Sequence, residues 1–261
     1  MTNFKRAHLL IGLCLVMASC STPSYFIPSI SGNDITYLPR PMAADSVKHG
    51  NYLSASVGGL VMPFNNSLTL GAINYNHAYT ANGLTAAIGA FGWAGKTEHI
   101  SATSTKATTT QLEFNGKGFY GGGLRTSLGF YQSSGSTEFR ILNWESSISY
   151  ESGSYSSFRQ EMSDLHDPNI FSSTKQTMFT TGGSTEIIWH PKRNPKNNFG
   201  FRLFIGFTDG LSESLNAQTQ SAVRGPASDF SFYFKLNKLF GIINSGANKG
   251  SASKLTLGYA F

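Results

Sequence analysis

The sequence predicts an all-β protein, an antiparallel transmembrane-type β-barrel of about eight to ten strands. Three observations favour it: apolar and small polar residues alternate from residue 51 onward, charged residues are scarce, and glycine and aromatic residues are abundant. Charged residues make up 13% of the chain, about half the usual fraction in soluble domains. This composition fits a wall that has lipid on one side and a polar lumen on the other.

The last eight residues, 254–261, show the alternation most clearly. Their apolar side chains share one face of a strand and their small side chains share the other: Leu255, Leu257, Tyr259 and Phe261 against Thr256, Gly258 and Ala260. A chain that ends in this way resembles the closing strand of bacterial outer-membrane β-barrels, in which a terminal Phe is an assembly signal.

The N-terminus has the order of an export signal. Residues 1–8 carry Lys5 and Arg6, residues 9–17 form an apolar run, and Ala18 and Ser19 precede Cys20. A membrane-spanning helix needs about 20 apolar residues, so the run indicates a removable signal peptide over residues 1–19.

The residues Met17-Ala18-Ser19-Cys20 resemble a lipobox, although Met17 replaces the usual Leu. The resemblance implies cleavage before Cys20 and its lipidation, including palmitate, as in outer-membrane β-barrel lipoproteins of Gram-negative bacteria. An ordinary signal peptide with an incidental Cys20 is the alternative. Cys14 lies in the removed segment, so no disulfide is expected in the mature chain. No acidic run follows Cys20, which favours anchoring in the periplasmic leaflet.

Residues 20–50 are expected to form a lipid-anchored leader before a barrel over residues 51–261. Four prolines make regular structure improbable there: Pro23, Pro28, Pro39 and Pro41. Several aromatic and aliphatic residues nevertheless favour packing. A periplasmic tether and a partial plug of the barrel are both open.

The strand count is ambiguous. The alternation gives nine strands without residues 108–114 and ten with them, and Asn82-Gly83 and Asn115-Gly116 are hairpin signals. Single-chain bacterial barrels have an even number of strands. Ten strands counted in this way would put the long connections 153–173 and 209–227 on the side of the termini, where turns are normally short. Eight strands would avoid this conflict.

A soluble all-β sandwich, anchored in the periplasm, is the structural alternative. Its outward faces should carry many Lys, Glu and Asp residues, whereas the polar faces here are mostly Ser, Thr, Gly and Asn. Those residues fit a tightly filled lumen better. The charges that do fall on the polar faces are candidate lumen residues, expected to pair because an unpaired buried charge is costly: Arg125, Glu145, Glu186, Arg202 and Lys235.

The sequence indicates no catalytic or metal site and no cofactor. The six His residues form no convincing set, and His166 beside Asp164 and Asp167 fits an exposed loop. No hydrolase, zinc-protease, redox or nucleotide-binding motif occurs. Without residues 1–19, the net charge falls from +6 to +4, with no basic cluster suited to nucleic acid.

Function is therefore predicted only in outline. The first hypothesis is an outer-membrane β-barrel lipoprotein with a structural or interaction role. Its resemblance implies outer-membrane lipid and the barrel-assembly and lipoprotein-sorting machinery as partners. The second is a narrow transport or ligand-binding barrel, and the third is a lipid-modifying enzyme.

Overall fold

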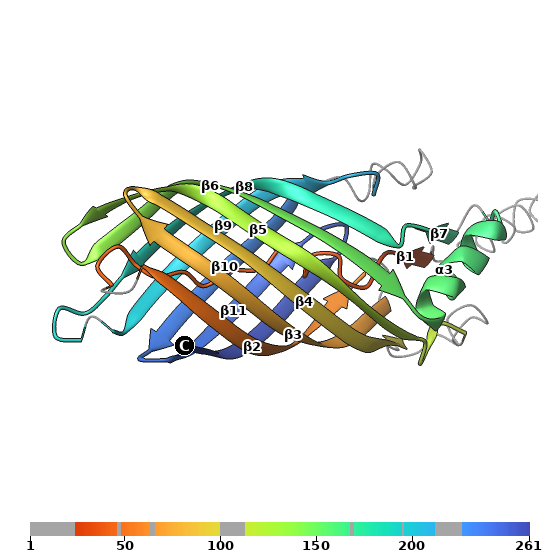
Figure 1. The fold of residues 1–261 in the computed structure, drawn as a ribbon. Helices are drawn as coiled ribbons and strands as arrows, with labels where there is room; N and C mark the ends of the chain where they lie inside the picture. Colours follow the sequence, from red (N-terminus) through yellow and green to blue (C-terminus); the bar gives the residue numbers. More distant parts are fainter. Residues whose placement is uncertain are drawn as a thin grey trace, which may run out of the picture.

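Ten antiparallel strands form a closed barrel in the computed structural model, which describes residues 24–45, 48–62, 66–99, 113–167, 170–194, 196–211 and 226–261 (Figure 1). In order around the barrel, these strands are β2 (His49–Val61), β3 (Asn66–Ala81), β4 (Leu84–His99), β5 (Gly118–Ser134), β6 (Thr137–Ser152), β8 (Thr177–Trp189), β9 (Asn198–Thr208), β10 (Ala227–Leu236), β11 (Leu239–Ala247) and β12 (Ser251–Ala260). Strand β12 pairs with β2 over the register Ser251↔Val61 to Ala260↔Tyr52. The predicted all-β barrel is confirmed, and closure excludes the sandwich alternative.

Three smaller elements lie at one end of the barrel (Figure 1). The short strand β1 (Ser24–Phe26) pairs in parallel with β7 (Ile170–Ser172) in a separate two-stranded sheet. Helix α3 (Ser154–Asp164) packs beside them and buries Tyr155, Phe158 and Met162. Among the described helices, none is long and apolar enough to cross a membrane.

The outer wall of the barrel is apolar and exposed on every strand. Leu128, Trp144 and Phe207 are each more than half exposed, although side chains of this kind are normally buried in water-soluble proteins. Aromatic residues lie near both ends of the wall, as in the interfacial girdles of membrane barrels: Tyr120, Tyr150, Phe179 and Phe207 near one end, and Tyr79, Phe130, Phe139 and Tyr259 near the other.

A bulge in β6 changes which residues face the lumen. The pairing of β6 with β8 shifts between Arg140 and Asn143. Ile141 and Leu142 are consecutive and both point outward, with about 60% of each side chain exposed (61% and 60%). The extra residue therefore lets Arg140 and Asn143 both face inward, and both are fully buried.

The two ends of the barrel differ in their connections. At the short-turn end, three hairpins have tight turns at residues 82–83, 135–136 and 237–238, and a longer connection spans 190–197. Asn82 and Gly83 have φ of 54° and 80°, which is the left-handed geometry of the predicted Asn-Gly hairpin. At the long-loop end lie the long connections 100–117, 153–176 and 209–226 and the short connections 62–65 and 248–250. Phe261 pairs with Asn51 at the short-turn end.

The prediction of a strand over residues 108–114 is wrong where the structure describes it. Glu113 and Phe114 form a helical turn, and Phe114 is fully buried; residues 108–112 lie outside the described part. The turn at Asn115-Gly116 joins this helical turn to β5 instead of linking two strands. The tenth strand is β11, whose apolar–polar alternation is hidden because the inward residues Phe240 and Ile242 are themselves apolar. Between them, Gly241 is on the outer face, where the ring of Phe234 covers it.

The absence of a strand at residues 113–114 removes the conflict over the long connections, and β11 restores the even number of strands. Residues 153–173 and 209–227 now follow odd-numbered barrel strands and lie opposite the C-terminus. All three long connections thus lie at the end opposite Phe261, together with the short connections 62–65 and 248–250. Long loops opposite the termini are the arrangement normal for bacterial barrels.

An arginine on the outer wall tests whether that wall faces lipid. Leu203 lies in the middle of β9 and Leu236 at the short-turn end of β10; both side chains are exposed. In lipid vesicles we expect Leu203→Arg to lower the free energy of unfolding by about 2–4 kcal/mol and Leu236→Arg by about 0–1 kcal/mol. Urea titration followed by tryptophan fluorescence measures both. Equal losses at the two depths would contradict a lipid-facing wall.

Candidate functional site: the filled lumen

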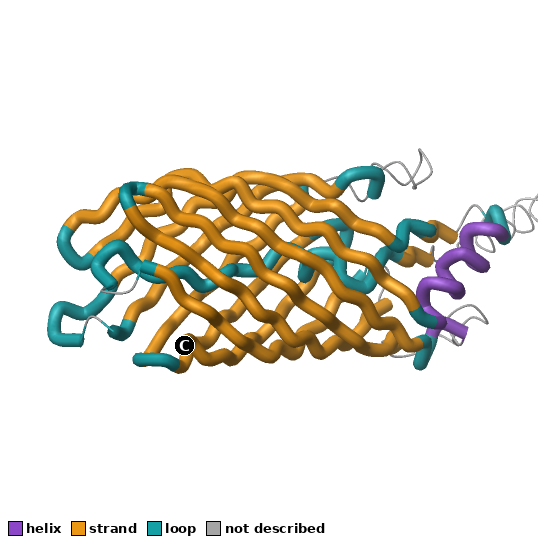
Figure 2. Tube along the Cα trace, in the orientation of Figure 1, coloured by secondary structure: helices purple, strands orange, loops and turns teal. Residues whose placement is uncertain are grey.

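The N-terminal segment 24–45, called here the plug, begins with β1 at the long-loop end and then runs through the inside of the barrel. Figure 2 shows it as a loop running through the cage of strands. Most of its residues are buried, among them Ile27, Ser29 and Tyr37 with at most 1% exposed. The described residues from Ser29 to Ala43 therefore contact inward-facing side chains of the wall.

At the long-loop end, the plug is held by a buried carboxylate. Both the backbone N–H and the hydroxyl of Ser29 donate to Glu151 Oε2, at 2.6 and 2.5 Å. The other carboxylate oxygen of Glu151 accepts from Arg159 Nη2 of helix α3 at 2.7 Å. Trp93 Nε1 donates to the Ser29 hydroxyl at 3.1 Å. Glu151 therefore links the plug, the barrel wall and the helix.

Tyr155 adds a second link between helix α3 and the plug. Its hydroxyl donates to the carbonyl oxygen of Ile27 at 2.7 Å. Burial raises the pKa of Tyr155 above its ordinary value, so the phenol keeps the proton that this hydrogen bond needs. Phe26, Phe114 and Phe158 pack against one another here, with ring centroids 5.1–6.0 Å apart.

In the middle of the lumen, two cations of the wall bind backbone carbonyl groups of the plug. Arg125 donates to the carbonyl oxygens of Asp34 and Asn33, at 2.5 and 3.1 Å. Lys254 Nζ donates to the same Asn33 carbonyl at 2.9 Å. The Arg125 guanidinium also lies 3.6 Å from the ring centroid of Phe91, a favourable cation–π geometry.

Towards the short-turn end, a buried ion network encloses Arg40 of the plug. Arg40 Nη2 and Arg140 Nη1 both donate to Glu186 Oε2, at 2.8 and 3.1 Å. Arg140 Nε also donates to Glu138 Oε1 at 2.8 Å. The second oxygen of Glu138 accepts from the backbone N–H of Ala43 at 2.5 Å. One plug cation and two wall carboxylates are therefore joined through Arg140.

The charged side chains of a second ion network all belong to the wall. Arg202 Nε donates to Glu145 Oε1 at 3.0 Å, and its Nη1 lies 2.5 Å from Asp229 Oδ1. Ser184 and Asn244 donate further hydrogen bonds to these carboxylates. Asn244 also accepts a hydrogen bond from Thr36 of the plug at 3.1 Å, so the network reaches the plug.

The buried charges are balanced in number among the described residues. Six cations and six carboxylates are buried: Arg40, Arg125, Arg140, Arg159, Arg202 and Lys254, and Asp34, Glu138, Glu145, Glu151, Glu186 and Asp229. Ion pairs join four of these cations to five of the carboxylates, whereas Arg125 and Lys254 donate to plug carbonyl groups. A buried ion is tolerated only with a partner of opposite charge and saturated hydrogen bonds. The plug supplies Arg40 and Asp34 as well as the backbone groups that complete several of these contacts. Chemically, the arrangement binds a polypeptide segment and leaves its charges neutralised.

The five sequence-predicted lumen charges have different surroundings. Glu145 and Arg202 pair with each other, Glu186 binds Arg40 and Arg140, and Arg125 binds plug carbonyls. Lys235 shares the inward side of β10 with Tyr233 but is only half-buried. It lines a depression of ≈ 550 Å³ at the short-turn end.

Sequence reasoning missed most of the plug contacts. Glu138 and Arg140 alternate with Phe139 and Ile141, a pattern that could have placed them inside. Arg40 stands between two prolines, and nothing in that pattern points to a lumen. Glu151 and Lys254 lie near the ends of predicted strands, where the assignment of faces is least certain.

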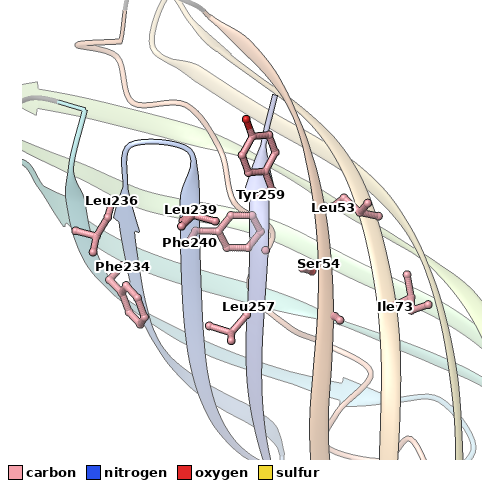
Figure 3. Close-up of a pocket in the computed structure, with 11 residues that line it drawn as sticks. Leu53, Ser54, Ile73, Phe234, Leu236, Leu239, Phe240, Leu257 and Tyr259 are labelled. Atoms are coloured by element: carbon pink, nitrogen blue, oxygen red, sulfur yellow. The ribbon is translucent and has the colours of Figure 1, made fainter.

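The outer wall carries an apolar groove of ≈ 670 Å³ near the β12–β2 closure. Figure 3 shows Leu53, Ile73, Leu257 and Tyr259 around it. It faces away from the lumen, so it is separate from the filled interior. The described residues hold no group of three His, Cys, Asp or Glu side chains that could bind a metal ion.

Comparison with known proteins gives likeness of fold only. No family model and no curated protein matches the chain. Among solved structures, Neisserial surface protein A is similar with a TM-score of 0.36 and 13% identity, covering 81% of this chain and 95% of that one. The Pseudomonas putida toluene transporter TodX has a TM-score of 0.33 and 8% identity, covering 91% and 73%. The transport unit of autotransporter AIDA-I from Escherichia coli has a TM-score of 0.32 and 11% identity, covering 85% and 93%. Likeness at this level carries no functional argument.

Removing a shared lumen carboxylate tests the network. Glu186→Gln keeps the side-chain shape but leaves Arg40 and Arg140 without their common anion. We expect a loss of about 3–5 kcal/mol in the free energy of unfolding. The matched control is Glu98→Gln, whose partner Lys96 lies 3.6 Å away in an exposed pair and which should cost about 0–1 kcal/mol. Urea titration in lipid vesicles measures both, and similar losses would refute the network's role.

Proposed function

We propose that this chain is a bacterial outer-membrane β-barrel lipoprotein with a closed lumen and a structural or interaction role. The observation that carries the proposal is the plug, because residues 24–45 fill the lumen and bind its buried charged side chains. A barrel filled in this way offers partners its loops and its outer wall, and offers solutes no passage.

The outer wall supports the membrane part of this proposal. Exposed aliphatic and aromatic side chains surround the barrel on all strands, and closure leaves no unpaired strand edge. A structure can stay in hydrocarbon only if its backbone polar groups are satisfied internally. Outer-membrane lipid and the barrel-assembly machinery are then the expected partners.

The lipoprotein part rests on the sequence. Residues 1–19 and Cys20 lie outside the described residues, so signal cleavage and palmitate on Cys20 are proposed from the lipobox-like Met17-Ala18-Ser19-Cys20. The lipoprotein-sorting machinery is the partner that this lipid would require.

A narrow transport barrel is the second candidate, favoured by the polar inner face. Passage would require the plug to leave the lumen, which separates Arg40 from Glu186 and Ser29 from Glu151. Each separation strands a buried charge or a buried polar group, at a cost of several kcal/mol. A closed resting state follows from these contacts. The lipid-modifying enzyme has no built catalytic arrangement among the described residues that would support it.

Ion conductance in planar bilayers separates the closed barrel from a gated one. We expect the intact protein to be silent, because the plug occupies the lumen. A stapled variant, Thr36→Cys with Asn244→Cys, joins plug and wall where their side chains lie 3.1 Å apart. The matched control, Thr36→Ser with Asn244→Ser, keeps small polar groups at both positions but cannot form a disulfide.

The conductance of the oxidised cysteine pair distinguishes a movable plug from a closed barrel. If the wild type and the serine control conduct, and oxidation of the cysteine pair abolishes that current, the closed-barrel proposal is wrong and the plug is a gate. If all three proteins are silent, the transport reading is removed.

A further inference from the structure

The plug has a fixed direction through the barrel. Ser24, Tyr25 and Phe26 pair with β7 beyond the long-loop end of the wall. The chain then meets Glu151 at residue 29, Arg125 and Lys254 at residue 33, and Asn244 at residue 36. It reaches Glu186 at residue 40 and Glu138 at residue 43 before β2 begins at His49 at the short-turn end.

The wall positions of these partners confirm that the plug crosses the whole barrel. Glu151 is next to the last residue of β6 at the long-loop end, and Glu138 is next to its first residue at the short-turn end. The plug therefore runs along the length of β6 in the opposite direction. Figures 1 and 2 show the same course, with β1 beside α3 at one end and the C-terminus at the other.

The length of the barrel separates the two ends by more than a short linker can span. Strand β3 has 16 residues, about 50 Å at ~3.4 Å per residue, which a tilt of about 45° reduces to roughly 35–40 Å along the barrel axis. Four residue steps join Cys20 to Ser24, and an extended chain covers at most about 14 Å over that distance. Cys20 can therefore reach only the leaflet at the long-loop end.

We infer that the protein displays its N-terminus, with the acyl chains of Cys20, at the outer leaflet of the outer membrane and not at the periplasmic leaflet. The lipidation in this inference rests on the proposed function; the direction of the plug does not. Bacterial barrels place short turns in the periplasm and long loops outside, so the end that holds Ser24, β7 and α3 faces the exterior. The absence of an acidic run after Cys20 gave the opposite expectation, and the threaded plug outweighs it because it is a geometric constraint.

External proteolysis of intact cells tests this placement. Cells that make the chain without any insertion are fed a clickable fatty acid and treated from outside with a broad-specificity protease, which can cut within residues 21–23, upstream of every described plug contact. The segment between Cys20 and Ser24 keeps its length, so the reach of Cys20 is unchanged. Protease added outside should cut the acylated N-terminus away. The heat-modifiable barrel should then lose at least 90% of its lipid label without prior permeabilisation.

Two controls separate the ways in which the test can fail. Cys20→Ser should carry no fatty-acid label. If the chain with Cys20 also carries none, the proposed lipidation is wrong. The direction of the plug is then still determined by whether external protease cuts the N-terminal segment. Glu161→Cys in α3 and Lys238→Cys in the β10–β11 turn are both exposed and report orientation. A membrane-impermeant maleimide should label only Glu161→Cys in intact cells.

Two outcomes overturn the inference. If label is retained in intact cells and lost only after the outer membrane is permeabilised, while Glu161→Cys is labelled from outside, the N-terminus lies on the periplasmic side. If Lys238→Cys is the variant labelled from outside, the barrel is inverted and the inference is equally refuted.

Discussion

The cost of leaving a charge unpaired away from water shapes this molecule more than any other constraint. Arg140 shows how it is met: one guanidinium binds Glu138, Glu186 and the carbonyl of Pro41. Two of these partners belong to the wall and one to the plug. The plug is thus part of the electrostatic structure of the barrel. Without it, charged side chains of the wall such as Arg140 would lose hydrogen-bond partners.

Barrel size explains why a separate segment is needed. Eight strands enclose an interior that wall side chains can just fill, whereas this barrel has ten. Large inward residues such as Trp93, Phe204 and Phe240 take part of the space, and residues 24–45 take the rest. The close packing of Tyr37 on Tyr233, with ring centroids 4.8 Å apart, and of Leu38 in the same cluster belongs to this filling.

The strand faces could be predicted from the sequence because each follows from the two-residue period of a single segment. Leu128 and Trp144 point outward as their neighbours imply, and Arg125, Glu145 and Arg202 are buried. Three features could not be read in this way. Strand β11 has apolar residues on its inward face, the β6 bulge shifts the period by one residue, and the partners of Arg40 lie 87 to 146 residues away along the chain. Local patterns contain no information on contacts of that range.

Continuity between the plug and β2 has a consequence for biogenesis. The first barrel strand follows directly from a segment that the finished barrel encloses, and β2 closes against β12, the last strand made. With the proposed acyl chains on Cys20, the free end of this segment would be too bulky to be drawn through a completed ring. The sheet must therefore curl around residues 24–45 while the seam between β2 and β12 is still open. Pairing of β2 with β12 is then the step that encloses residues 24–45, after which the segment is held inside the closed barrel.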